Sequence, residues 1–273
     1  MEAALLGCIL VSASFFAAVL EHPSSPVRQG IEDPLRRRAL MGLAMAGTNV
    51  ALIFSPWGKQ SGAHMNPSVT LTYLRLGKIA PADAAFYVLF QFAGGIAGTA
   101  LASLAASAWL SGPPIHHVAT TPGRFGPAAA FAGELGISAI LMLAVLTASN
   151  TRRLAPWTGV FAASLVFLFI SFEAPLSGMS LNPARTFGPA LAERLWDALW
   201  IYFTAPPLGM LLGAEAYRLL RRSHPVLCAK LHHHNDKRCI FRCGYAMPAP
   251  ARETPSTAPA SQQGVSLDIN QLS

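Results

Sequence analysis

The chain has 273 residues, of which 52% are hydrophobic and only 12% are charged, and its formal net charge is +7. A soluble domain carries about a quarter charged residues, so the composition excludes an ordinary water-soluble enzyme, and the high hydrophobic fraction excludes a disordered chain. The basic residues lie between apolar blocks instead of on one polar face, so we expect no nucleic-acid partner. The composition indicates the lipid bilayer as the partner.

Six apolar stretches reach, or nearly reach, the roughly 20 residues of a membrane-spanning helix. In chain order they cover residues 3–20, 39–57, 84–110, 127–150, 155–172 and 198–219. Only Glu134 places a charge well inside one of them, and a carboxylate at such a depth is costly enough to need a structural or functional reason. We therefore expect six transmembrane helices, with Glu134 supporting a neighbouring backbone.

Basic residues near the ends of these stretches predict the orientation. An even number of spans places both termini on one side, and Lys and Arg accumulate on the cytoplasmic side. Seven of them follow the last stretch: Arg218, Arg221, Arg222, Lys230, Lys237, Arg238 and Arg242. Arg152 and Arg153 agree, whereas the arginines of residues 36–38, in the first predicted external loop, disagree. On balance we predict a multi-pass protein of the cell membrane with both termini in the cytoplasm.

A short motif occurs twice in the chain. It reads SGAHMNPSVT at residues 61–70 and SGMSLNPART at residues 177–186, so five residue types recur at a constant offset of 116 positions. An acidic residue opens the first stretch (Glu2) and another lies early in the fourth (Glu134), and each half contains two spans, the motif and a third span. Because three spans reverse the direction of the chain, this pattern predicts an inverted repeat. Its copies cover about 2–110 and 127–220, within a membrane domain of residues 1–222.

Each motif contains the start signal of a helix. Asn is a preferred N-cap and Pro is favoured at the first helical position, as in Asn66-Pro67 and Asn182-Pro183. The stretches that follow, 68–76 and 184–194, are too short to span a bilayer, so their ends must face protein or a watery cavity. A single Asn-Pro pair would favour a simple turn, but two copies in register favour two half-helices. Their facing N-termini would carry positive partial charge and oppose cations.

These motifs resemble those of the aquaporin superfamily of major intrinsic proteins, over nearly all of residues 2–220. Residues 61–68 resemble the family's first Asn-Pro-Ala box, residues 182–189 its second, and residues 200–209 its sixth span. The resemblance implies an all-α membrane protein with six transmembrane helices and two half-helices in an inverted repeat. It also implies a pore in each subunit of a homotetramer.

The motif residues suggest how such a pore would select. We expect the side chains of Asn66 and Asn182 to cap their own helices through the carbonyl and to turn their amide N–H groups toward passing water. This would interrupt a chain of waters that conducts protons. Arg185 stands at a helix N-terminus, where a cation is disfavoured, and a pore-lining cation that repels ions would explain it. The alternative is an arginine that reaches the external interface.

The resemblance assigns supporting roles to other residues. By the family's pattern, Glu2 and Glu134 would brace the loop backbones, and His64 is interpreted as a loop-bracing or pore-mouth residue. The remaining motif positions with a supporting role are Pro67, Ser68, Pro183 and Ala184.

The narrow filter departs from both main subclasses of the family. Spacing from Asn182 assigns Ile170 and Met179 to the filter, and Met41 is the candidate from the second span. Strict water channels of the family usually carry a histidine at the position of Ile170, and glycerol facilitators usually carry an aspartate where this chain has Thr186. We therefore expect water and other small neutral solutes to be the passing molecules.

The residues after the repeat form a tail of different composition. Residues 223–246 are basic and rich in His and Cys, and residues 247–273 are predicted to be disordered. Thiolate and imidazole suit zinc, although the spacings only loosely match structural zinc sites. The candidate ligands are Cys228, His232, His234, Cys239 and Cys243. The alternative is a solvated basic segment held near anionic lipid headgroups.

Taken together, these features predict a passive channel without enzymatic activity or a cofactor, unless the tail binds zinc. A membrane-embedded metal-dependent enzyme or sensor using the tail, and a secondary transporter, are the alternatives. A coupled transporter would need ionisable groups inside the spans, and the spans contain few.

Overall fold

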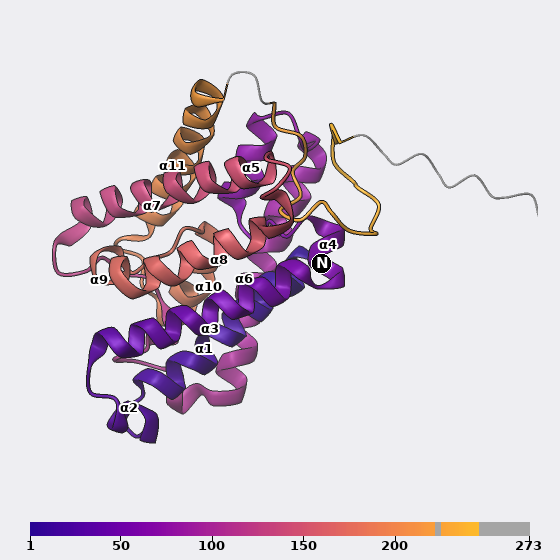
Figure 1. The fold of residues 1–273 in the computed structure, drawn as a ribbon. Helices are drawn as coiled ribbons and strands as arrows, with labels where there is room; N and C mark the ends of the chain where they lie inside the picture. Colours follow the sequence, from indigo (N-terminus) through magenta and orange to yellow (C-terminus); the bar gives the residue numbers. More distant parts are fainter. Residues whose placement is uncertain (222–224, 246–273) are drawn as a thin grey trace, which may run out of the picture.

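The computed structural model describes residues 1–221 and 225–245, and the regular elements in these residues are helical. Figure 1 shows the long helices packed side by side, with the last described residues running past α4 and α5. The elements are α1 (Glu2–Glu21), α2 (Pro26–Gly30), α3 (Pro34–Phe54), α4 (Pro56–Ser61), α5 (Pro67–Arg75), α6 (Pro81–Leu110), η1 (His116–Val118), α7 (Gly126–Ser149), η2 (Ala155–Trp157), α8 (Thr158–Leu168), η3 (Phe169–Glu173), α9 (Ala174–Ser177), α10 (Pro183–Glu193) and α11 (Leu199–Leu220).

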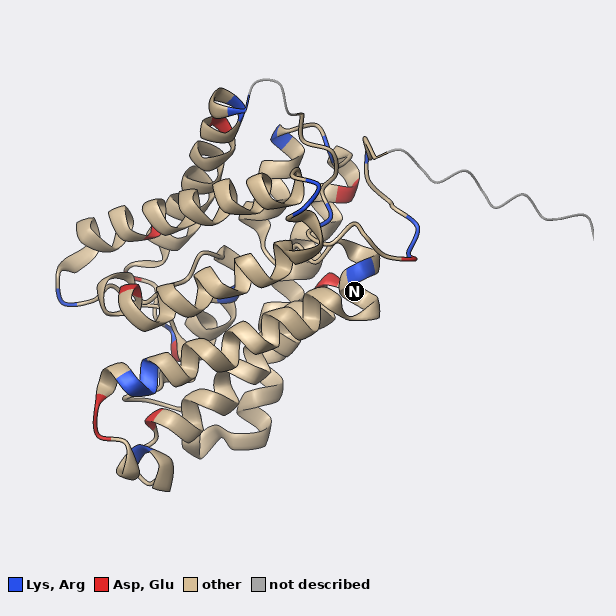
Figure 2. Cartoon of the chain, viewed as in Figure 1, with Lys and Arg blue, Asp and Glu red and all other residues tan. Residues whose placement is uncertain are grey.

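The long helices match the predicted spans within a few residues, except at α3. Four stretches of the described chain are long and apolar enough to cross a bilayer: Glu2–Glu21, Pro81–Leu110, Gly126–Ser149 and Ala155–Ser177. Helices α3 and α11 have similar lengths of 21 and 22 residues but carry more polar side chains at their ends. Charged residues gather at helix ends and in loops, which leaves most of each long helix apolar (Figure 2).

Helix α3 begins earlier than predicted, at Pro34, because Asp33 caps its N-terminus and accepts a hydrogen bond from the Leu35 N–H at 2.8 Å. Residues 36–38 therefore lie in the first turns of this helix and not in a loop. Arg37 is buried, and its guanidinium donates to the Glu21 carboxylate at 3.1 Å and to the Ile31 carbonyl at 2.8 Å. This arginine therefore holds the end of α1 and the loop before α3 against the start of α3.

The fifth predicted span is segmented and not one regular helix. A 3-10 turn leads into α8, and the chain then widens into the π-helical segment η3 before α9 ends at Gly178 in a left-handed conformation with φ of +84°. Single turns of π-helix are rare and often occur at functional sites. Ile170, a predicted filter residue, lies in this segment.

Two short helices begin in the middle of the bundle, as the motifs predict. Helix α5 has 9 residues and α10 has 11, and each has Asn as its N-cap and Pro at the first helical position. The Asn66 side-chain oxygen accepts from the Ser68 N–H, and that of Asn182 accepts from the Ala184 and Arg185 N–H groups. The caps therefore satisfy N–H groups that have no partner within the helix.

Glycines allow the long helices to approach closely in the same way in both halves. A Cβ atom on Gly98 of α6 would lie 2.6 Å from the Gly7 carbonyl oxygen of α1, and one on Gly213 of α11 would lie 2.3 Å from the Ala139 carbonyl oxygen of α7. These distances leave no room for a side chain. Close contact between backbones is a common way for helices to associate in a membrane, where apolar surfaces gain little from leaving lipid.

The tail packs onto the bundle. Cys228, Ala229 and Lys230 are buried, and the Leu231 N–H donates to the Gly62 carbonyl at 3.1 Å. The interpretation of this segment as solvated is therefore wrong for these residues, because Val226, Ala229 and Leu231 belong to the same hydrophobic core as Ile53 of α3 and Tyr73 of α5. The predicted disorder of residues 247–273 lies outside the described residues.

We expect Gly98→Leu and Gly213→Leu each to destabilise the protein by about 1–3 kcal/mol, the usual cost of overpacking a close contact. Thermal unfolding of the purified protein in detergent measures this effect. Gly136→Leu is the matched control, because a Cβ atom on Gly136 in α7 meets nothing within 4 Å. Equal loss of stability in all three variants would contradict the close-packing argument.

Candidate functional site

The two motif loops meet, and the asparagine of each loop donates a hydrogen bond to a carbonyl of the other. The Asn66 amide nitrogen donates to the Leu181 carbonyl at 2.8 Å, and the Asn182 amide nitrogen donates to the Met65 carbonyl at 2.7 Å. The two bonds are equivalent under the repeat, since Met65 and Leu181 occupy the same motif position. Each amide nitrogen carries two hydrogens, and one of them is used here. From the sequence, we expect the amide N–H groups of both asparagines to face passing water. Since each asparagine uses one hydrogen for the opposite loop, one hydrogen per asparagine stays available to a water.

A buried carboxylate holds each loop. Glu2 accepts from the Ser61 hydroxyl at 2.7 Å and from the Met65 N–H at 2.6 Å. Glu134 accepts from the Ser177 hydroxyl at 3.0 Å and from the Leu181 N–H at 2.8 Å. Both glutamates therefore contact the loop backbones in the way expected of braces.

The loops have a strained backbone that explains why they need bracing. Ala63, Met65, Met179 and Leu181 have φ between +50° and +60°, although none is glycine. A side chain in this left-handed region costs about 1–2 kcal/mol per residue. Such a conformation persists only where surrounding contacts hold it. The hydrogen bonds to the two glutamates supply these contacts.

A cavity of about 320 Å³ passes the meeting point of the loops. Its walls come from α1, α3, α7, α8 and the two loops and are mostly apolar. The predicted pore residues all line it: Met41, His64, Asn66, Ile170, Met179, Asn182 and Arg185. The supporting residues Pro67, Ser68, Pro183 and Ala184 are buried beside it. The structure thus brings the seven predicted residues to one passage.

Arg185 lies toward one end of the cavity, which the charged residues Glu21 and Arg38 also line. The Arg185 guanidinium donates to the Thr120 hydroxyl, and Thr186 lies behind it in a buried hydrogen bond with Ser180. Ile170 also lines the cavity but presents no hydrogen-bonding group. Thr120 is a partner that sequence reasoning missed, because it lies in an irregular loop outside both motifs.

The other end of the cavity is defined by His64. Its Nε2 donates to the Ala229 carbonyl at 2.9 Å, its Nδ1 pairs with the Thr70 hydroxyl at 3.0 Å, and its ring stacks on Phe241. Both ring nitrogens are therefore engaged, as expected of a bracing histidine. Leu231 also lines this end. The sequence analysis missed this contribution of the tail, although the apolar run 226–231 within a basic segment was a signal for it.

The tail brings together a different ligand set from the predicted one. Single ligand atoms of Cys228, His233, Cys239 and Cys243 all lie within 4.8 Å of one another. Of the predicted ligands, the three cysteines belong to this cluster, but His232 and His234 do not. The ring of His232 packs against Phe54 instead. Consecutive side chains of an irregular chain point in different directions, so one of three adjacent histidines faces the thiols.

In this cluster Cys228 is buried, whereas His233, Cys239 and Cys243 are partly buried. Burial raises the pKa of the Cys228 and Cys243 thiols and lowers the pKa of the His233 imidazole. Without a bound cation, the neutral forms of these groups are therefore favoured.

Comparison with known proteins agrees with this geometry. Residues 5–217 match the family model of the major intrinsic proteins. The chain is 34% identical to aquaporin NIP1-3 of Oryza sativa subsp. japonica over 176 residues, 64% of this chain and 60% of that protein. It is 36% identical to aquaporin NIP2-1 of Zea mays over 201 residues, 71% of this chain and 66% of that protein. The chain thus spans about 60% of the length of the first of these relatives.

A solved structure supports the same fold. The aquaglyceroporin from Plasmodium falciparum superposes with a TM-score of 0.62 at 18% identity, over 79% of this chain and 93% of that one. The family match covers both motifs and all of the long helices in whole or in large part. With its paired half-helices, its braced loops and this match, the chain belongs to the major intrinsic protein family.

Proposed function

We propose that the protein is a passive channel for water and other small uncharged solutes, and that it excludes ions and protons. The reciprocal hydrogen bonds from Asn66 to the Leu181 carbonyl and from Asn182 to the Met65 carbonyl, inside a lined cavity, carry this proposal. They join two helix N-termini at one point of the passage, where their dipoles oppose a cation. The relatives reported above are named aquaporins, which supports the same function.

Two groups would give the channel its selectivity. Arg185 adds a full positive charge beside the passage, and a fixed cation raises the barrier for other cations. The free amide hydrogens of Asn66 and Asn182 would orient the oxygen of a passing water and so interrupt proton transfer along the water chain.

We infer that small neutral solutes other than water also pass. Ile170, Met41 and Met179 give the cavity near Arg185 an apolar wall, which accommodates carbon-bearing solutes better than a ring of polar groups does.

The channel is proposed to be a homotetramer in the cell membrane, with both termini in the cytoplasm. Large apolar side chains on the outer surface, such as Leu104 and Phe86 at 86% and 60% exposure, suit contact with lipid or with neighbouring subunits. The arginines of residues 36–38 were the charges that opposed this orientation. Arg37 is buried and paired with Glu21, which weakens that objection.

The rival functions have less support. The His/Cys cluster that a metal-dependent enzyme or sensor would use contributes no residue to the cavity wall. A secondary transporter needs ionisable groups that bind and release coupling ions. Glu2 and Glu134 are instead occupied by loop backbones. No cofactor is needed for passive transport.

Proteoliposomes containing the protein should shrink faster than empty liposomes in stopped-flow osmotic measurements, while planar bilayers containing it carry no ionic current. Arg185→Leu should admit cations. Two unit charges about 8 Å apart repel by about 2 kcal/mol at an effective dielectric constant of about 20, so the cation current should rise about thirtyfold above background.

Arg153→Leu, in the exposed connection before α8, is the matched control and should leave the current unchanged. A sizeable cation conductance through the unmodified protein would contradict the proposed function.

Replacing Ile170 by histidine tests the filter. Ile170→His adds a hydrogen-bonding nitrogen and narrows the cavity near Arg185, so the ratio of glycerol to water permeability should fall. One hydrogen bond contributes about 1 kcal/mol, which corresponds to a change of a few-fold to about tenfold. Stopped-flow light scattering with matched water and glycerol gradients measures this ratio.

Ile170→Leu keeps the apolar character and should leave the ratio near that of the unmodified protein. An unchanged ratio in Ile170→His would mean that this side chain does not line the constriction. A protein that passes water but none of glycerol, urea and ammonia would contradict the argument from the apolar wall.

A further inference from the structure

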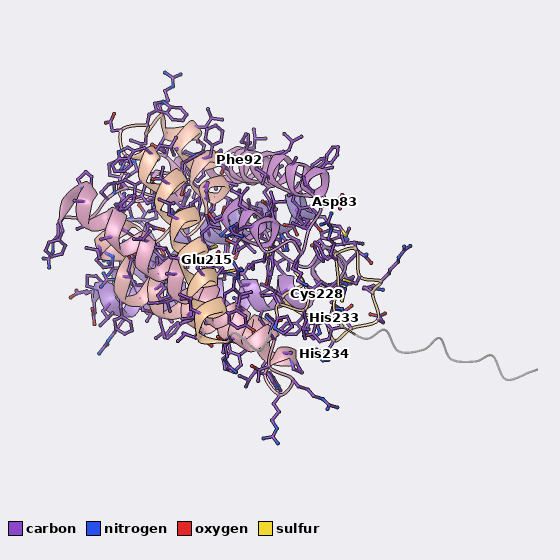
Figure 3. The ribbon with its side chains drawn as sticks, turned by 90° about the horizontal axis from the view of Figure 1, so that it is seen from above. Asp83, Phe92, Glu215, Cys228, His233 and His234 are labelled. Carbon is purple, nitrogen blue, oxygen red and sulfur yellow. The ribbon has the colours of Figure 1, made fainter. Side chains whose placement is uncertain are left out.

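The cluster of Cys228, His233, Cys239 and Cys243 has the composition of a structural zinc site, with three thiols and one imidazole. Figure 3 shows Cys228 and His233 next to each other, with His234 close by. The three cysteines are free thiols. No other group of this kind occurs in residues 1–221 and 225–245.

The distances between the ligand atoms suit one tetrahedral ion. Zinc bonds of about 2.3 Å to sulfur and 2.0–2.1 Å to nitrogen place neighbouring ligand atoms about 3.5–3.8 Å apart. In the structure, the sulfurs of Cys228 and Cys239 are 3.4 Å apart, and Nε2 of His233 lies 3.0 Å from the Cys243 sulfur. All pairs lie within 4.8 Å. Shifts of about 1 Å or less would therefore complete the coordination geometry.

Lys230 is the second observation that points to a metal. Its side chain is buried at 2% exposure, and within residues 1–221 and 225–245 Nζ donates only to the carbonyls of Lys237 and Arg238, at 3.1 and 3.3 Å. No carboxylate forms an ion pair with it among the described residues. Burying an ammonium without a countercharge is unfavourable.

A bound zinc ion would supply this countercharge. Three thiolates and one neutral imidazole around Zn²⁺ carry a net charge of −1, and Lys230 follows the ligand Cys228 by two residues in the chain. The Lys230 N–H also donates to the Cys228 sulfur at 3.5 Å. Hydrogen bonds of this kind from the second shell orient metal ligands and stabilise their charged form.

The ligands enclose the part of the tail that contacts the passage. Between Cys228 and His233 lie Ala229, whose carbonyl accepts from His64, and Leu231, which lines the cavity. Between Cys239 and Cys243 lies Phe241, whose ring stacks on His64 at 5.3 Å. One ion bound to all four ligands would therefore join both segments that touch His64.

From this arrangement we propose that Cys228, His233, Cys239 and Cys243 bind one zinc ion, which holds residues 225–245 as a clamp across the His64 end of the passage. Zinc binding releases the thiol protons to solvent, and no redox change is involved. With the proposed cytoplasmic orientation, the reducing compartment keeps the thiols available for the metal. The site and the clamp are measured without any transport assay, so their failure is distinct from failure of the channel function.

The first test is the metal content of the full-length protein purified in detergent. Mass spectrometry of metals should find about one zinc per chain. His233→Phe keeps the stacking on Tyr245 but removes one ligand, and Cys239→Ser removes another. Each of these two single variants should reduce zinc binding at least about tenfold. His234→Phe and Cys8→Ser are the matched controls, because neither residue belongs to the cluster, and both should retain the metal. Elution as a folded particle in size-exclusion chromatography separates loss of metal from misfolding.

The second test uses the unmodified protein, so its result does not depend on whether a variant folds. Removing zinc with a chelator should raise the rate of trypsin cleavage after Lys237 and Arg238 by about tenfold, while cleavage after Arg153 stays constant. Re-addition of zinc should restore protection.

Three results would overturn the proposal. Iron bound in place of zinc would show that the cluster is not a zinc site. A metal-free protein with a disulfide between Cys228 and Cys239 would make it a redox pair. Bound zinc whose removal leaves trypsin cleavage of the tail unchanged would show that the ion does not hold the clamp.

Discussion

The side-chain amides of Asn66 and Asn182 join two half-helices end to end, and the rest of the site is arranged around this junction. A helix that begins at the depth of a membrane exposes N–H groups where lipid offers no acceptor. Each asparagine satisfies its own helix through the side-chain oxygen and the opposite loop through the nitrogen. Neither half of the repeat can therefore satisfy its polar groups without the other.

This junction imposes costs that other residues offset. The loops enter the bundle with left-handed residues such as Met65 and Leu181, and a carboxylate beneath each loop receives their N–H groups. Hydrogen bonds to a charged acceptor are about twice as strong as those between neutral groups, which makes a buried glutamate an effective brace. Tyr87 and Tyr202 add equivalent bonds to the Ser61 and Ser177 carbonyls, at 2.7 and 2.6 Å.

The features that could be predicted from the sequence are those that the repeat encodes twice. The constant offset predicts both half-helices, because Asn-Pro has a local physical meaning at each copy. Glu134 could be predicted as a brace because an isolated carboxylate in an apolar span needs partners. The family resemblance then assigned Ile170, Met179 and Met41 to the wall of one cavity, which they line.

The features that occur once could not be predicted in this way. Thr120 reaches Arg185 from an irregular loop, and no local pattern in the sequence specifies such a distant contact. Arg37 looked like a topogenic charge because sequence position does not reveal burial, yet its guanidinium bonds to Glu21 and to loop carbonyls. His233 could not be distinguished from its two neighbours, since the direction of each ring depends on the packing of Phe54 and Tyr245.

The two ends of the passage differ although the scaffold between them is nearly symmetric. His64 and Ser180 are equivalent motif positions, and each bonds to the threonine six residues later. Arg185 has Val69 as its counterpart, and both line the cavity. A full charge at one copy and an apolar side chain at the other make the electrostatic field along the passage asymmetric, in addition to the helix dipoles at the junction. The opposite end instead receives His64 and the tail, which contact the passage at a place distinct from the residues that oppose ions.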